Sequence, residues 1–185
     1  MNSIEQQRKR LLEIITKDAY FREKIILSSG KESDFYIDAR LVTLNAEGVY
    51  LIASIMLDMV KNDGITAIGG PTLGADPMVG ALGVLSFQAG HPVKTFIIRK
   101  EAKKHGKQKQ IEGPVLTAQD HIILIDDVAT TGKAFLQSLD VFDQMGFKAK
   151  KAICIVDRNE GAREALAARG CELLKIFDIN EIHKK

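Results

Sequence analysis

The sequence predicts one α/β domain built on a mostly parallel sheet that helices flank on both faces. Two observations lead to this fold class. Short apolar runs that are typical of strands alternate along the chain with longer segments of helical periodicity. The strand-like runs are apolar at nearly every position rather than at every second one, which indicates strands buried on both faces, as in a parallel sheet.

The chain has 185 residues and a net charge of +2, which suit one globular domain, residues 1–185. No segment reaches the roughly 20 apolar residues of a membrane span. The polar start of the chain does not resemble a signal peptide, so we expect a cytoplasmic protein without a membrane partner. The small net charge does not suggest a nucleic-acid partner. Cys154 and Cys171 have no metal-like spacing and should pack in the core.

The N-terminal part should contain two amphipathic helices separated by an irregular segment. Ser3 and Gln6 form the pattern of a capping box, and the apolar residues that follow share one helix face. Residues 25–40 have no regular periodicity. Asn45 is positioned to cap the second helix. The apolar residues on its expected buried side are Val49, Ile52, Met56, Met59 and Val60.

The rest of the chain alternates strands with helices. Expected strands lie at residues 65–69, 93–99, 121–125, 151–156 and 172–177. Expected helices lie at residues 76–88, 133–145 and 160–169, and Gly146 and Gly170 should end the last two. Ligands of parallel sheets bind beyond the carboxyl ends of the strands, so the loops at these ends are the candidate site loops.

The segment from His121 to Ala134 carries the most specific chemical pattern. A buried strand should end at two adjacent acids, Asp126 and Asp127, and a Thr-Thr-Gly turn should lead directly into a helix. Backbone N–H groups and two hydroxyls of residues 130–132 suit a phosphate at the positive end of that helix. The acids suit the vicinal hydroxyls of a sugar or a phosphate-bound Mg²⁺. These groups predict a ribose 5-phosphate site, whereas an Asp cap with a Thr-rich turn leaves the second acid unexplained.

Residues 99–109 form a basic segment with six Lys or Arg residues and one Glu, a net charge of +5 without His105. Such a segment is often a solvated loop or an RNA-binding patch. Here it follows an expected strand end, on the same rim as the phosphate motif. A mobile cationic loop there suits a leaving group with several negative charges, such as pyrophosphate. Lys103 and His105 would neutralise the charge that develops on it.

Five blocks of the chain resemble orotate phosphoribosyltransferases, a family of type I phosphoribosyltransferases. They lie, in order, at residues 29–38, 69–77, 99–113, 121–134 and 156–161. The resemblance implies the type I phosphoribosyltransferase fold, a central mostly parallel sheet flanked by helices, with a small hood from residues 1–45 and the extreme C-terminus. It also implies Mg²⁺-dependent transfer of ribose 5-phosphate from phosphoribosyl pyrophosphate to orotate, giving orotidine 5′-phosphate and pyrophosphate.

The resemblance assigns roles residue by residue. The implied catalytic residues are Lys103, His105, Asp126 and Asp127. The implied contacts of phosphoribosyl pyrophosphate are Arg99, Lys100, Lys103, His105, Asp126, Asp127, Val128, Ala129, Thr130, Thr131, Gly132, Lys133 and Ala134. Thr130 and Arg158 would bind orotate, and an arginine fork beyond a strand end is well suited to pair with a carboxylate. Phe35 and Tyr36 would flank the base.

Mg²⁺ is expected to bind mainly through substrate oxygens and water, without a dedicated set of protein ligands. The family also implies a homodimer in which the loop at residues 99–109 reaches the neighbouring subunit's site. Two positions depart from some members, which carry lysines where this chain has Ser28 and Gly74. A further departure is Ala134, where many members have a hydroxyl, and Lys133 is an unusual cation at a helix start.

Two alternatives remain open. One is a phosphoribosyltransferase for another base, such as a purine or uracil, against which Arg158 and the basic loop argue. The other is a non-catalytic regulator that binds nucleotide or RNA on the same fold. A regulator would be expected to carry an added DNA-binding domain or a degraded basic loop, whereas the lysines of this loop are present.

Overall fold

The computed structural model describes residues 3–26, 32–100 and 110–184. In this part of the chain a six-stranded sheet has the order β10-β9-β8-β5-β6-β7. The strands are β5 (Ala67–Pro71), β6 (Lys94–Ile98), β7 (Ile111–Glu112), β8 (Ile122–Ala129), β9 (Ala149–Asp157) and β10 (Glu172–Asp178). All neighbouring strands run parallel except β6 and β7, so the predicted mostly parallel sheet is confirmed.

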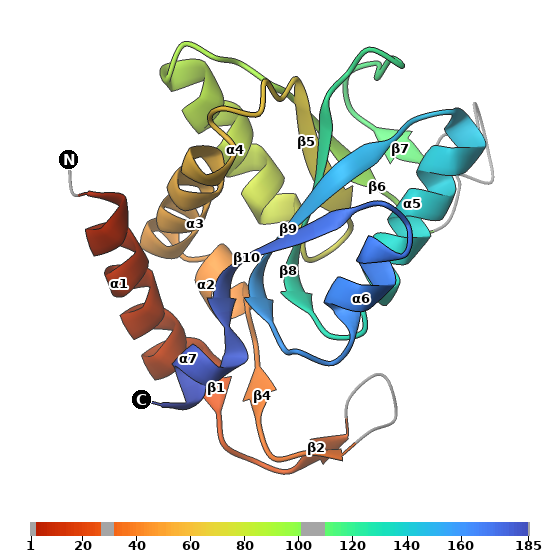
Figure 1. Ribbon diagram of the computed structural model, residues 1–185. Helices are drawn as coiled ribbons and strands as arrows, with labels where there is room; N and C mark the ends of the chain where they lie inside the picture. Colours follow the sequence, from red (N-terminus) through yellow and green to blue (C-terminus); the bar gives the residue numbers. More distant parts are fainter. Residues whose placement is uncertain (1–2, 27–31, 101–109, 185) are drawn as a thin grey trace.

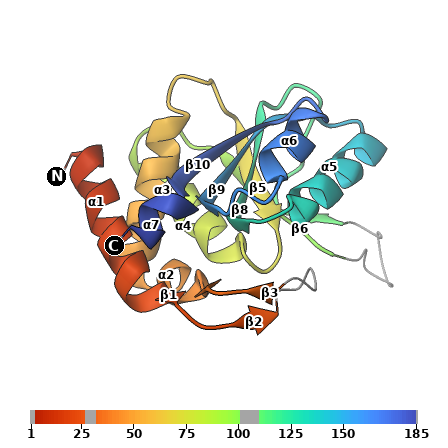
Figure 2. The ribbon, with the colours of Figure 1, turned by 60° about the horizontal axis from the view of Figure 1, so that its bottom comes forward.

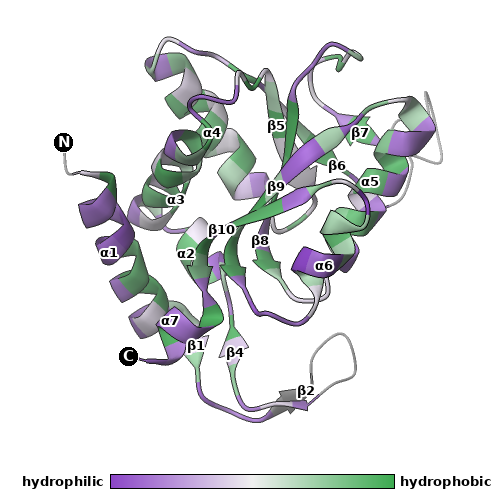
Figure 3. Ribbon diagram, in the orientation of Figure 1, coloured by the Kyte–Doolittle hydropathy of each residue, from purple (hydrophilic) through white to green (hydrophobic). Residues whose placement is uncertain are grey.

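Helices cover both faces of this sheet (Figure 1). The longer ones are α1 (Ile4–Ile14), α3 (Ala46–Met59), α4 (Asp76–Gln88), α5 (Lys133–Met145) and α6 (Ala162–Ala167). Alternate residues of β8 enter two separate cores. Ile123 and Ile125 pack in the cluster that contains α1, α3 and α4, whereas Ile122 and Leu124 pack with α5 and α6. This two-sided burial explains why the strand reads as a continuous apolar run, and Figure 3 shows hydrophobic colour along much of the sheet.

The expected starts of the first two amphipathic helices are confirmed. Ser3 and Gln6 form both hydrogen bonds of a capping box at the start of α1, and the Asn45 side chain accepts a hydrogen bond from the Gly48 N–H at the start of α3. The last turn of the first helix widens into a π-helix, η1 (Ile15–Ala19). The sequence pattern did not indicate this change of helix type.

Several boundaries differ from the predictions; β5, for example, was expected at residues 65–69 and spans Ala67–Pro71. Two of the differences have a clear physical reason. Strand β8 was expected to end at Ile125, but it continues to Ala129 because Asp126 and Val128 still pair with Cys154 and Val156 of β9. The two acids therefore lie within the paired part of β8, near its carboxyl end, rather than after the strand. Helix α6 begins later than expected, since Asn159 and Gly161 have positive φ angles of 57° and 103° that a right-handed helix cannot include.

A small layer, the hood, lies beyond the carboxyl ends of β8, β9 and β10 (Figures 1 and 2). It contains short antiparallel pairs, β1 with β4 and β2 with β3. Its elements are β1 (Tyr20–Phe21), β2 (Ile25–Ile26), β3 (Glu32–Ser33), β4 (Tyr36–Ile37), α2 (Arg40–Thr43) and the C-terminal helix α7 (Ile179–His183). Arg8 of α1 joins that helix to α7 of this layer through a 2.6 Å ion pair with Glu181.

Candidate active site

A cleft of about 690 Å³ opens at the carboxyl ends of β5, β6 and β8. Its walls come from the β4–α2 segment, the turn after β5, the end of β6, the end of β8 and the start of α5. Seven of the expected site residues line it, namely Tyr36, Arg99, Lys100, Asp126, Asp127, Val128 and Ala134. The fold therefore brings together groups that are up to 98 positions apart in the chain.

Asp126 and Asp127 form an acid pair at the floor of the cleft. Asp126 is only 8% exposed, and its Oδ1 accepts a hydrogen bond of 3.0 Å from the Asp127 N–H. Asp127 Oδ1 accepts one of 2.7 Å from the Val128 N–H. The Oδ2 atoms of both side chains accept no hydrogen bond from the described residues, so each acid keeps one oxygen for a ligand.

Burial is the main cause that raises the pKa of both carboxyls. For Asp126 the rise is large, and the charge of neighbouring Asp127 adds to it. For Asp127 the hydrogen bond from Val128 and the positive charge of Arg40 partly oppose the effect of burial on the pKa. A buried and a half-buried carboxylate side by side are costly without a partner. The pair is therefore suited to bind hydroxyl donors or a cation.

The loop after β8 provides an anion cradle beside the acid pair. Gly132 has a φ angle of 76° at the N-cap of α5, and no side chain caps this helix, so the first-turn N–H groups lack a capping acceptor. A Cβ at position 132 would lie 2.7 Å from Leu166 Cδ1, so a side chain here would also press against α6. Thr130 and Thr131 are half-buried, and their hydroxyls bond to no described residue. Ala129 is buried and Lys133 exposed.

Cationic side chains lie on the opposite wall. Arg99 forms a 3.5 Å ion pair with Glu112, and Lys100 is exposed at the end of β6. Lys103 and His105, the expected catalytic residues of the basic loop, lie outside the described residues. The prediction from sequence missed Arg40, which lines the cleft from α2 and is held by Asp38 at 3.1 Å. The sequence offered one signal for it, because Arg40 lies two positions after the end of a block with family resemblance.

The turn after β5 closes the cleft next to the acids. Thr72 donates from its N–H to the Ile98 carbonyl at 2.9 Å, and its hydroxyl donates to Asp76 Oδ2 at 2.8 Å. The peptide bond between Thr72 and Leu73 is cis. Gly74 faces the acid pair, where a Cβ would stand 2.6 Å from Asp126 Oδ1 and 2.9 Å from Asp127 Oδ1. A side chain at this position would therefore intrude on the acids.

Arg158 lies beside the phosphate loop, outside the lining of the cleft, as does Thr130. Its N–H donates to the Ala129 carbonyl at 2.9 Å, which places it next to Thr130. The side chain is only 5% exposed, and Nε donates to Glu160 Oε1 at 2.9 Å. Nη2 donates to Ser33 Oγ at 3.1 Å, and the guanidinium carbon lies 4.3 Å from the centre of the Phe35 ring. Nη1 donates to no described residue, so it is left for a ligand.

Among the described residues, no group of three or more His, Cys, Asp or Glu side chains could hold a metal ion. In the same part of the chain, no helix is both long and apolar enough to cross a membrane. Cys154 and Cys171 are buried free thiols within one core cluster, so the predicted packing role is confirmed.

Comparisons with solved structures define the class of protein as a type I phosphoribosyltransferase. A phosphoribosyltransferase from Corynebacterium diphtheriae superposes with a TM-score of 0.83 at 29% identity, covering 96% of this chain and 99% of that one. The orotate phosphoribosyltransferase of Mycobacterium tuberculosis H37Rv, in complex with Fe(III) dicitrate, gives 0.82 at 31% identity, covering 95% and 98%. The same enzyme in complex with phosphoribosyl pyrophosphate gives 0.79 at 28% identity, covering 96% and 99%.

Sequence relatives name the family. The orotate phosphoribosyltransferase of Synechocystis sp. is 38% identical over 179 residues, which is 97% of this chain and 90% of the relative. That of Thermosynechococcus vestitus is 38% identical over 180 residues, covering 97% and 95%. No family model matches the chain. On these relatives, the chain belongs to the orotate phosphoribosyltransferase family.

Proposed function

We propose that this chain transfers ribose 5-phosphate from phosphoribosyl pyrophosphate to orotate, giving orotidine 5′-phosphate and pyrophosphate in pyrimidine (UMP) biosynthesis. The observation that carries the proposal is the acid pair Asp126–Asp127, which lies between an uncapped helix start and a cationic wall in one cleft. A sugar diol, a 5′-phosphate and a charged leaving group each find their chemical complement there.

The ribose 5-phosphate end is held by the segment from Asp126 to Ala134. Its phosphate accepts hydrogen bonds from the N–H groups at the start of α5 and from the hydroxyls of Thr130 and Thr131. The ribose hydroxyls donate to the free Oδ2 atoms of the acid pair. These contacts fix C1 of the ribose in the cleft, and such positioning is a major part of catalysis in a displacement reaction.

The pyrophosphate end lies toward the cations Arg40, Arg99 and Lys100. As the bond from C1 to the pyrophosphate oxygen breaks, negative charge grows on the leaving group and positive charge on the ribose, as in glycoside chemistry. Fixed cations on one side and the acid pair on the other stabilise both charges. Lys103 and His105 are part of this proposal as further cations of the basic loop.

Mg²⁺ fits this site as a partner of the substrate rather than of the protein alone. Two carboxylates with one free oxygen each are suitable oxygen donors for a hard cation, but they are too few to complete an octahedral shell. Asp126 and Asp127 would hold the ion together with substrate oxygens and water. When bound, it neutralises charge on the pyrophosphate.

The base is held by Arg158 and Thr130. The carboxylate of orotate pairs with the free Nη1 of Arg158, and Glu160 keeps the rest of the guanidinium in place. A ring nitrogen of orotate then forms the new bond to C1 as the bond from C1 to the pyrophosphate oxygen breaks, and the proton of that nitrogen passes to water or to the departing pyrophosphate. A phosphoribosyltransferase for a purine or uracil would have no use for this buried cation, since these bases carry no carboxylate.

The proposal includes a homodimer with the loop at residues 99–109 shared between subunits, a cytoplasmic location, and no nucleic-acid or membrane partner. It is tested with purified protein, Mg²⁺ and phosphoribosyl pyrophosphate, by following the loss of orotate absorbance in parallel with assays of uracil, adenine and hypoxanthine. Consumption of orotate alone is expected. Turnover of another base alone would overturn the role of Arg158. Binding of the sugar phosphate without any turnover would favour the alternative of a non-catalytic regulator on the same fold.

A further inference from the structure

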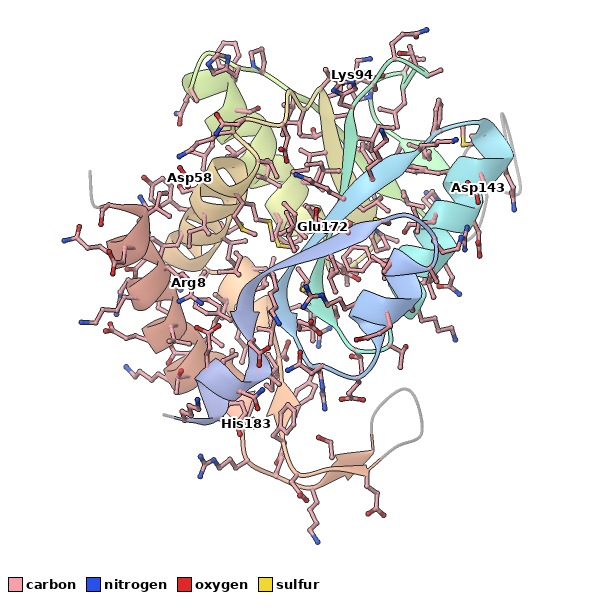
Figure 4. All side chains as sticks on the ribbon, viewed as in Figure 1. Arg8, Asp58, Lys94, Asp143, Glu172 and His183 are labelled. Carbon is pink, nitrogen blue, oxygen red and sulfur yellow. The ribbon has the colours of Figure 1, made fainter. Side chains whose placement is uncertain are left out.

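The last helix of the chain contacts an aromatic residue of the hood. His183 of α7, labelled in Figure 4, lies with its ring centre 4.5 Å from that of Phe35, and the two planes meet at 90°. Its Nδ1 is 2.7 Å from the hydroxyl of Tyr20. The Tyr20 ring lies 5.9 Å from the Phe35 ring. Two rings, one from α7 and one from β1, therefore hold Phe35 in place.

Phe35 in turn supports the buried guanidinium of Arg158 at 4.3 Å. Edge-to-face ring pairs and cation–π contacts are each directional, so a fixed ring limits the positions that the guanidinium can take. Only Glu160 and Ser33 give the Arg158 side chain further hydrogen bonds among the described residues. A shift of Phe35 would thus remove the aromatic contact that supports one face of the Arg158 guanidinium.

The same helix is tied to the backbone next to Arg158 by a second contact. Asn159 follows Arg158, has a φ angle of 57°, and donates from Nδ2 to both carboxylate oxygens of Asp178 at 3.0 Å. Asp178 is the N-cap of α7. Helix α7 and its N-cap are therefore linked to Arg158 indirectly by two routes, one through Asn159 in the loop that carries Arg158 and one through the Phe35 ring against its guanidinium.

We propose that His183 is a positioning residue for the substrate carboxylate, acting through Phe35 on Arg158. This inference rests on the proposed binding of orotate by Arg158. A free arginine side chain has much rotamer entropy to lose when it binds a ligand. The Arg158 guanidinium is already held in place, and its Nη1 is left for a ligand. It therefore loses less conformational entropy when the carboxylate binds, which increases the affinity for orotate.

The test compares KM for orotate with KM for phosphoribosyl pyrophosphate in His183→Ala, His183→Phe and the control Lys184→Ala, whose side chain is exposed at the end of the same helix. We expect His183→Ala to raise KM for orotate about tenfold, on the scale of one lost aromatic pair. KM for phosphoribosyl pyrophosphate should stay within about twofold. His183→Phe keeps a ring against Phe35 and should restore most of the affinity for orotate, and Lys184→Ala should change neither constant.

An unchanged KM for orotate in His183→Ala, or an equal rise in both constants, would overturn the positioning role. If His183→Ala does not fold, His183→Gln decides the question, because it keeps a polar partner for Tyr20 but loses the ring. It should then raise KM for orotate while His183→Phe does not, and the reverse order would overturn the inference. Turnover of orotate by the unaltered protein in the same assay separates failure of this inference from failure of the proposed function.

Discussion

Gly74 lies so close to Asp126 that a Cβ atom at position 74 would stand 2.6 Å from Asp126 Oδ1. Real Cβ contacts do not reach this distance, so any side chain there must displace the turn or the acid. The lysine that some family members carry at this position is incompatible with this arrangement of the acid pair. The described cations that line the cleft are instead Arg40, which enters it from α2, Arg99 and Lys100.

Gly74→Ala should therefore lower kcat/KM for phosphoribosyl pyrophosphate by at least about tenfold, because displaced acids no longer position the ribose. Steady-state kinetics with saturating orotate measures the effect. The matched control is Gly80→Ala in α4, where a Cβ meets nothing within 4 Å. That variant should keep full activity and gain up to about 1 kcal/mol of stability, since alanine is the better helix former. Equal activity of the two variants would contradict this account of the turn.

Arg40→Gln should raise KM for phosphoribosyl pyrophosphate about tenfold, while KM for orotate stays nearly constant. A charge-assisted contact to phosphate contributes about 1.5–3 kcal/mol, and the partial exposure of Arg40 places the effect at the low end. Arg10→Gln is the control, because Arg10 also pairs with an acid, Glu47 at 2.7 Å, but lies on α1. A rise in KM for orotate alone would assign Arg40 to the base instead.

Arg158→Gln should raise KM for orotate by about 10–100-fold, the scale of a lost hydrogen bond to a charged group. Uracil has the same ring without the carboxylate, so its use should be nearly unchanged and the preference for orotate over uracil should fall. Competition between the two bases measures this ratio directly. Arg163→Gln, an exposed arginine of α6, should leave the ratio unaltered, and a ratio that survives in Arg158→Gln would refute the carboxylate contact.

Asp126→Asn should stabilise the folded protein near neutral pH. Burial, followed by the charge of Asp127, raises the pKa of Asp126 in the folded state, whereas the unfolded chain keeps a value of about 3.9. The folded state therefore binds the proton more tightly. As pH rises from about 3.9 to the raised pKa, wild-type stability falls, and above that pKa the cost is fully present. An amide of the same shape does not carry this cost.

Thermal unfolding checks the sign. At pH 7.5 the variant should have the higher Tm, by about 2–4 °C for each 1 kcal/mol in a chain of this size. The difference in Tm between variant and wild type should shrink towards zero near pH 3.5, where Asp126 is largely protonated in both the folded and the unfolded protein. Asp58→Asn, at an exposed ion pair with Lys61, should show no comparable gain. A lower Tm for Asp126→Asn at pH 7.5 would show that the charged pair is favourable as it stands.

The sequence was sufficient to predict the α/β class, most strands of the six-stranded sheet and the cleft-lining acids, because these depend on local patterns. Continuous apolar runs mark strands buried on both sides, and Asp126–Gly132 forms a contiguous motif. The contacts of Arg158 could not be predicted in this way. Ser33 and Phe35 are more than 120 positions away, and only the folded hood brings them beneath the guanidinium.

The resemblance implied that the extreme C-terminus belongs to the hood, but neither its helix nor the contact of that helix with Phe35 could be predicted from the sequence. Residues 179–183 are too few for a clear helical period, and they form α7 because Asp178 and Glu181 build a capping box there. The widened turn η1, the short strand β7 and the entry of Arg40 into the cleft likewise depend on tertiary packing rather than on local propensity.

The most direct test of the central claim is the initial rate of orotidine 5′-phosphate formation by the unaltered protein and by the double variant Asp126→Asn/Asp127→Asn. Both proteins are assayed with orotate, phosphoribosyl pyrophosphate and Mg²⁺, after thermal unfolding has shown that each is folded. The account predicts product from the unaltered protein and a loss of at least about 100-fold in the double variant. Equal rates for the two folded proteins would contradict the claim that this acid pair holds the reacting ribose.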